Sequence, residues 1–201
     1  QVVGSRDRGF TAQPGRPDPL PQQLGPERTH ELIVRDLLRQ ASTSRGFRML
    51  VTPPERHVAI GKSVAHALGG RYHSFEQAWF ERHDGELARM ERAERFVAQR
   101  GQLTRSAEQL FDDLLEEHGT PGTINVLGDT ALLGLFDALD QLRRFYDLTL
   151  SGEHGFWVLV IPGIIHDRQP LFNEKVPVWH LEGCTLPLLQ PIPLQEGSRL
   201  P

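Results

Sequence analysis

Hydrophobic residues recur at a helical period in several segments that are separated by short apolar runs. Where apolar positions fall three and four residues apart, one face of an amphipathic helix is predicted. Ser74 and Gln77 also have the spacing of a capping box at a helix start, and Asp84-Gly85 predicts a break. The expected helices cover residues 30–42, 55–68, 74–99 with that break, 106–118 and 130–144.

The short apolar runs between these segments have the length of β-strands. Residues 156–161 form a continuous apolar run, which is typical of a strand buried on both faces. We expect Pro162-Gly163 to end this strand, and residues 176–181 to form an edge strand because their proline lacks a ladder donor. The other expected strands are residues 47–52, 71–73 and 123–127.

Helices and strands therefore alternate along the chain. This order predicts an α/β fold with a mainly parallel sheet flanked by helices, in a three-layer arrangement like that of P-loop proteins. Residues 1–27 are rich in Gly, Pro, Gln and Arg and predict a flexible linker, which indicates that another segment precedes it. Residues 28–190 are expected to form a single domain, and residues 191–201 an irregular tail.

Composition narrows the possible partners. The formal net charge is −4, which disfavours nucleic-acid binding by bulk electrostatics. No apolar run approaches the ~20 residues of a transmembrane helix, so no membrane partner is expected. The single cysteine, Cys184, excludes an internal disulfide and fits a reducing compartment, so we expect a cytoplasmic protein and a passive thiol.

Gly61-Lys62-Ser63 matches the end of the phosphate-binding motif G-x-x-x-x-G-K-[ST]. In a working loop, backbone N–H groups surround the phosphates, the lysine neutralises charge and the hydroxyl binds Mg²⁺. The first glycine of the motif is replaced here by Arg56. Lys62 would also lie about 12 Å along a helix that starts near Pro54, at ~1.5 Å per residue. We therefore favour a relic or a coincidence, with Gly61 on the packed face of the helix, over a phosphate site.

Asp129 follows the predicted strand 123–127 and could hold Mg²⁺ in a P-loop enzyme. The next residue is Thr130, where ATP-hydrolysing members often carry a glutamate, so a helix-capping role for Asp129 is favoured. The nine histidines form no H-E-x-x-H or Cys/His zinc pattern, and no catalytic residues or metal ligands are predicted.

Residues 131–188 resemble the C-terminal region of the serine/threonine kinase-type proteins of bacterial BREX phage-defence systems. The resemblance rests on three segments, with residues 47–51 and the helix that follows them fitting the opening strand of the same unit. The segments are Leu132-Leu133-Gly134-Leu135-Phe136 with Leu139 and Leu142, residues 156–163 (FWVLVIPG), and residues 170–178 (PLFNEKVPV). The chain carries no kinase Gly-rich loop, H-R-D or D-F-G motif. The resemblance therefore implies an accessory domain that contacts other domains or subunits of a defence complex.

Three functions follow from these observations. The first is a non-catalytic, P-loop-like regulatory or interaction domain of a larger phage-defence protein, without a cofactor. The second is an active ATP- or GTP-binding domain that uses Mg²⁺ with Gly61, Lys62, Ser63 and Asp129. The third is a nucleic-acid contact module on the arginine-rich helices. Its arginines alternate with Glu86, Glu91 and Glu94, which is more typical of a solvated helix face, and they are Arg82, Arg89, Arg92, Arg95 and Arg100.

Overall fold

A computed structural model describes residues 26–43, 46–87, 93–135, 138–149, 151–180 and 183–193 of the 201-residue chain. Residues 1–25 of the predicted linker and 194–201 of the predicted tail lie outside these ranges. Arg89 and Arg92 of the arginine-rich segment also lie outside them, as do the side chains of Arg95 and Arg100.

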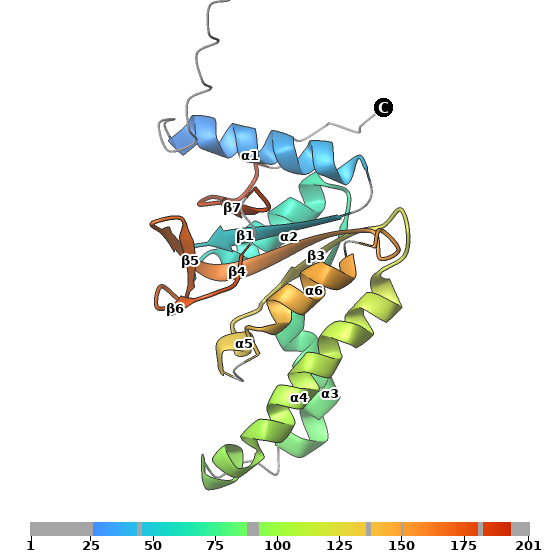
Figure 1. Ribbon diagram of the computed structural model, residues 1–201, viewed down its shortest axis with the longest axis vertical. Helices are drawn as coiled ribbons and strands as arrows, with labels where there is room; N and C mark the ends of the chain where they lie inside the picture. Colours follow the sequence, from blue (N-terminus) through green and yellow to red (C-terminus); the bar gives the residue numbers. More distant parts are fainter. Residues whose placement is uncertain are drawn as a thin grey trace, which may run out of the picture.

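A mainly parallel sheet forms the centre of the molecule, as the sequence predicts (Figure 1). The parallel strands are in the order β2-β3-β4-β1-β7, so β4 lies in the middle with β3 on one side and β1 on the other. Their bounds are β1 Gly46–Thr52, β2 Arg71–Ser74, β3 Ile124–Gly128, β4 Phe156–His166 and β7 Thr185–Pro187.

Helices cover both faces of this sheet and complete a three-layer α/β fold. α1 and α2 pack on one face, and α3, α4, α5 and α6 pack on the other. In Figure 1, α3 and α4 extend beyond the edge of the sheet. The bounds are α1 Pro26–Ala41, α2 His57–Ala67, α3 Phe75–Leu87, α4 Ala93–His118, α5 Leu132–Leu135 and α6 Gln141–Thr149.

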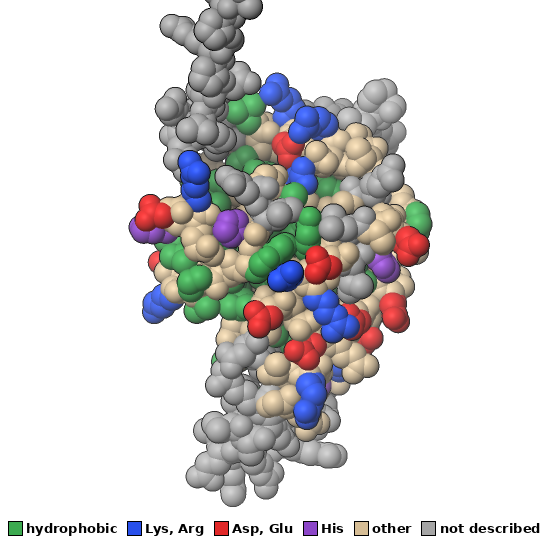
Figure 2. Space-filling view, viewed as in Figure 1, with side chains coloured by type: hydrophobic (Ala, Val, Ile, Leu, Met, Phe, Trp, Pro, Cys, Tyr) green, Lys and Arg blue, Asp and Glu red, His purple; other side chains and the backbone are tan. Residues whose placement is uncertain are grey.

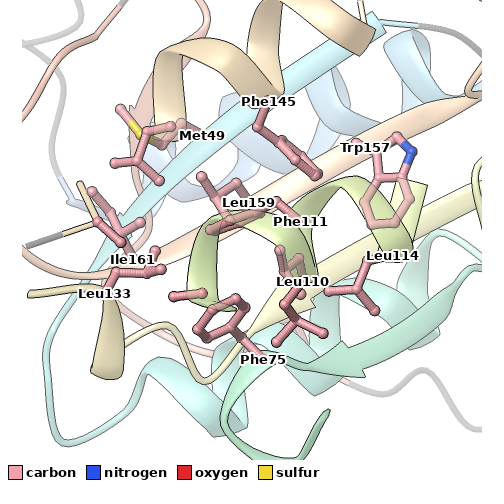
Figure 3. Packing of buried hydrophobic residues seen from close by; sticks show 14 of the residues in the cluster. Met49, Phe75, Leu110, Phe111, Leu114, Leu133, Phe145, Trp157, Leu159 and Ile161 are labelled. Carbon is pink, nitrogen blue, oxygen red and sulfur yellow. The ribbon is translucent and has the colours of Figure 1, made fainter. Parts of the chain in front are cut away.

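The alternation of side chains along β4 explains why its first six residues, 156–161, are all hydrophobic. Phe156, Val158 and Val160 face the α1/α2 layer. Trp157, Leu159 and Ile161 face the other layer, where they meet Phe75, Phe111 and Phe145 (Figure 3). All six of these side chains are fully buried, because helices cover both faces of this part of the strand.

Three predicted helix boundaries are wrong. α3 runs without a break through Asp84-Gly85 to Leu87. The helix expected at 106–118 is the second half of the 26-residue α4. The helix expected at 130–144 is two helices, α5 and α6, with Ala138 between them. Gly134, a weak helix former, packs against the Phe172 ring, and Leu133 of α5 and Leu142 of α6 both lie in the core.

The prediction that Pro162-Gly163 ends the long strand is also wrong. β4 continues to His166 and pairs with β5 (Gln169–Phe172), which in turn pairs with β6 (Val176–Pro177), both antiparallel. Pro162 is paired with the last residue of β1, so its missing N–H falls where the parallel ladder ends. A Cβ at Gly163 would clash with the Leu171 carbonyl, so glycine permits the close approach of β5. The expected edge strand at 176–181 is reduced to the two residues of β6.

The C-terminal segment supplies a strand that the sequence does not predict. β7 pairs in parallel with β1, and the backbone amides of Met49 and Leu188 bond to Cys184 and Val51. Leu188 and Ile192 are buried against the α1/α2 layer. Residues 191–193 of the predicted tail form no helix or strand, and Ile192 among them is buried. No helix within the described ranges is long and apolar enough to span a membrane.

Candidate functional site

The carboxyl ends of parallel strands are the usual ligand-binding edge of an open α/β sheet. Four side chains, His57, Lys62, Tyr72 and Asp129, are linked near this edge and are called here the strand-end cluster. They come from the first and second turns of α2, from β2 and from the residue after β3. This position corresponds to the strand–turn–helix unit in which a phosphate loop lies in P-loop proteins.

Asp129 is the centre of the cluster. Its Oδ2 accepts a hydrogen bond from the Tyr72 hydroxyl at 3.3 Å, and its Oδ1 lies 3.6 Å from His57 Nε2. Its backbone φ is +51°, a left-handed conformation that non-glycine residues adopt at some cost. The Asp129 carboxylate contacts Tyr72 and His57. The first residue of α5 is Leu132, so Asp129 does not have the predicted role of a helix cap.

His57 is oriented by the backbone. Its Nδ1 lies 2.5 Å from the Pro54 carbonyl oxygen, which can only accept, so Nδ1 carries the proton. Neutral His57 therefore presents a bare Nε2 to Asp129, and protonation converts this approach into an ion pair. Both side chains are largely shielded, with 15% and 17% of their surfaces exposed.

Tyr72 fits between two glycines. A Cβ at Gly61 would lie 2.8 Å from the Tyr72 ring, and one at Gly128 would clash with the phenol. Gly61 thus permits a close approach on the packed face of α2, as the sequence analysis favours. Burial raises the pKa of the Tyr72 hydroxyl, and the charge of Asp129 and its hydrogen bond raise it further. Tyr72 therefore remains a neutral donor to Asp129.

Lys62 and Ser63 point in different directions from the interior of α2. Lys62 is exposed, and its Nζ lies 5.8 Å from the centre of the Tyr72 ring. Ser63 is buried, and its Oγ donates to the Ile60 carbonyl and accepts a hydrogen bond from the Ile192 N–H at 2.9 Å. The serine hydroxyl thus holds the C-terminal segment, while Lys62 remains beside the strand-end cluster.

The turn between β1 and α2 differs from a phosphate loop. Pro53 and Pro54 follow β1 directly and have no N–H groups to offer. The Arg56 N–H is bonded to the Pro53 carbonyl, which closes a tight turn before α2. Asp129 also places a carboxylate beside the first residue of α2, where a phosphate would otherwise meet the helix N-terminus.

The fold therefore brings three of the four predicted residues, Gly61, Lys62 and Asp129, to a common neighbour in Tyr72. Gly61 packs against the same ring, and Ser63 is directed elsewhere. Sequence reasoning missed His57 and Tyr72. The sequence offers only their positions as a clue: His57 lies at the start of the predicted helix 55–68, and Tyr72 lies in the predicted strand 71–73.

Polar side chains also meet elsewhere in the described part of the chain. His83 Nε2 and Ser106 Oγ are 2.5 Å apart between α3 and α4. Arg48 Nη1 donates to Cys184 Sγ at 3.6 Å. Among the described residues, no group of three or more His, Cys, Asp or Glu side chains is arranged to hold a metal ion.

Comparison with known proteins adds no relative: no protein-family model matches the chain, and no curated protein or solved structure is significantly similar to it. The class that the fold and site define is an α/β domain with a parallel sheet whose strand-end edge is occupied by its own side chains.

Proposed function

We propose that this chain is a non-catalytic, P-loop-like regulatory or interaction domain of a larger bacterial phage-defence protein in the cytoplasm. The proposal rests on one observation: the β1–α2 turn lacks the features of a phosphate loop. Two prolines replace the N–H donors of a phosphate loop, and Asp129 occupies the helix N-terminus beside His57. The phage-defence context rests on the resemblance of residues 131–188 to BREX kinase-type proteins.

The charges of the side chains at this turn disfavour nucleotide binding. A nucleotide phosphate needs several converging N–H donors and a net positive site. The carboxylate of Asp129 repels an anion, and the nearby cation Lys62 lies over the Tyr72 ring. Ser63, which would hold Mg²⁺ in a working loop, is buried and bonded to Ile192.

An exposed apolar row supports a role in protein interaction. Ile164, Leu171 and Pro177 lie directly opposite one another across β4, β5 and β6. Ile164 is 39% exposed and Pro177 is also exposed. Hydrophobic side chains gather at the surface where β5 and β6 lie (Figure 2). Contiguous apolar surface of this kind is typical of a contact with another protein.

The first prediction tests the loss of nucleotide binding. Calorimetric titration of the wild-type chain with ATP or GTP and Mg²⁺ should show no binding at sub-millimolar concentrations, and no hydrolysis should be measurable. Lys62→Ala should change neither this result nor stability, because an exposed helical lysine contributes little and alanine is a good helix former. Tight, Mg²⁺-dependent binding by the wild type that is lost in Lys62→Ala would overturn the proposal.

That outcome would favour the second candidate, an ATP- or GTP-binding domain with an atypical phosphate loop. One observation speaks for it. Asp129 lies next to His57 in the first turn of α2, as a Mg²⁺-holding residue must, although the two residues are 72 positions apart in the sequence.

The second prediction tests the interaction surface. Ile164→Asp should weaken association with the kinase part of the same defence protein, supplied as a separate polypeptide, at least tenfold. Leu38→Asp on α1 is a matched control, since Leu38 is 41% exposed and lies on a different element. Equal affinities of both variants and the wild type in a pull-down titration would exclude the apolar row as the docking surface.

A further inference from the structure

Two histidine rings are stacked where α4 ends on the sheet. His73 lies on the edge strand β2, and His118 is the last residue of α4. Their ring centroids are 4.2 Å apart with an angle of 21° between the planes, and Trp157 of β4 lies 5.7 Å from His73. The stack is thus a contact between the helical layer and the strand at the edge of the sheet.

Asn125 of β3 connects this stack to the backbone. The asparagine is fully buried, and its Nδ2 donates to the His118 carbonyl at 3.2 Å and to Thr123 Oγ1 at 3.0 Å. Its Oδ1 is therefore the acceptor that faces His73 Nε2 at 3.0 Å, and His73 carries its proton on Nε2. The buried side-chain amide of Asn125 thus binds both the last carbonyl of α4 and the His73 ring.

The charged and titratable neighbours of the pair come from three elements. Arg71 is on β2, and Glu117 is on α4 with its Oε1 3.8 Å from His118 Nε2. His154, in the loop before β4, packs against Gly119. Burial lowers the pKa of His73, and the positive charges of His118 and Arg71 lower it further, against the opposing effects of Asn125 and Glu117.

We propose that the His73–His118 stack is a pH-sensitive attachment, which holds the last turn of α4 on the sheet while His73 is neutral and releases it when His73 is protonated. The partly buried His73 has little water to solvate a charge, and its ring is stacked 4.2 Å from the His118 ring with Arg71 nearby, so a proton on His73 disfavours the closed contact. This inference does not depend on the proposed function.

The direction of the pH effect follows from proton linkage. A histidine whose pKa is lowered in the folded state binds a proton more readily once the contact opens, so acidification favours opening. The contact is fully stable above the ordinary histidine pKa of about 6.5 and weakens as the pH falls below it. One proton taken up on opening changes the opening equilibrium by up to about tenfold per pH unit.

Hydrogen exchange at the end of α4 provides the third prediction. The amides of Gly119 and Thr120 donate to the carbonyls of Leu115 and His118, so their protection reports this turn. After correction for intrinsic exchange, we expect their protection to fall about tenfold between pH 7.0 and 5.5. His73→Gln should remove most of this dependence, whereas His66→Gln, an exposed histidine on α2, should leave it unchanged.

A second measurement covers the case in which His73→Gln does not fold. The ring resonances of His73 in the wild type should titrate below the ordinary histidine range, together with a change in the His118 resonances. Protection that does not depend on pH, an unchanged slope in folded His73→Gln, or titration of His73 in the ordinary range would each overturn the proposal.

Discussion

Replacing Val158 with aspartate should leave the chain without a stable fold. Val158 is fully buried in the middle of β4, between β3 and β1, and faces the α1/α2 layer. An unpaired carboxylate at this position costs on the order of 5 kcal/mol or more, which is comparable to the total stability of a typical domain. Circular dichroism should show no cooperative melting transition, and most of the protein should be insoluble.

Ile164→Asp is the matched control, because it introduces the same charge farther along the same strand. Ile164 lies beyond Pro162 on the outer face of the β4–β5–β6 sheet and is 39% exposed. This variant should fold with a melting temperature close to that of the wild type. A soluble Val158→Asp protein with wild-type melting would contradict the central position of β4.

Leu188→Ala should cause the second large loss of stability, in a part of the chain whose sequence does not predict regular structure. Leu188 follows β7, is fully buried, and packs with Ile33, Leu37 and Ile60 beneath α1 and α2. Truncation of a buried leucine leaves a cavity and costs about 2–5 kcal/mol. Urea denaturation should therefore show a clearly lower midpoint than that of the wild type.

The neighbouring Leu189 tests whether this loss comes from burial. Leu189 is 55% exposed, so Leu189→Ala should change the free energy of unfolding by less than about 0.5 kcal/mol. Similar effects of the two substitutions would show that the C-terminal segment does not pack on α1 and α2. The pair thus distinguishes an integral strand from a loosely attached tail.

The packing of this segment also changes the meaning of Gly61-Lys62-Ser63. Each residue has a local structural role: Gly61 accommodates Tyr72, Lys62 lies over the same ring, and Ser63 binds the Ile192 amide. Packing alone can therefore account for the presence of this partial phosphate-loop motif.

The sequence by itself determined the α/β class and the location of most elements. Helical periodicity marked α1, α2 and the second half of α4, because each of these helices buries one stripe of side chains. The continuous apolar run at 156–161 marked a strand covered on both faces, and β4 has this position. Such patterns involve residues that are close together in the chain, so they can be recognised in a single sequence.

Only the tertiary structure decided the continuation of β4 into β5, the division of residues 130–144 and the addition of β7. Each depends on a distant partner: Gly163 on Leu171, Gly134 on Phe172, and β7 on β1. The strand-end cluster also depends on distant partners, since Tyr72 and Asp129 are separated by 57 positions. The contact between Ser63 and Ile192 spans 129 positions. Local periodicity carries no information about such contacts, because they arise only when the strands are ordered in the sheet.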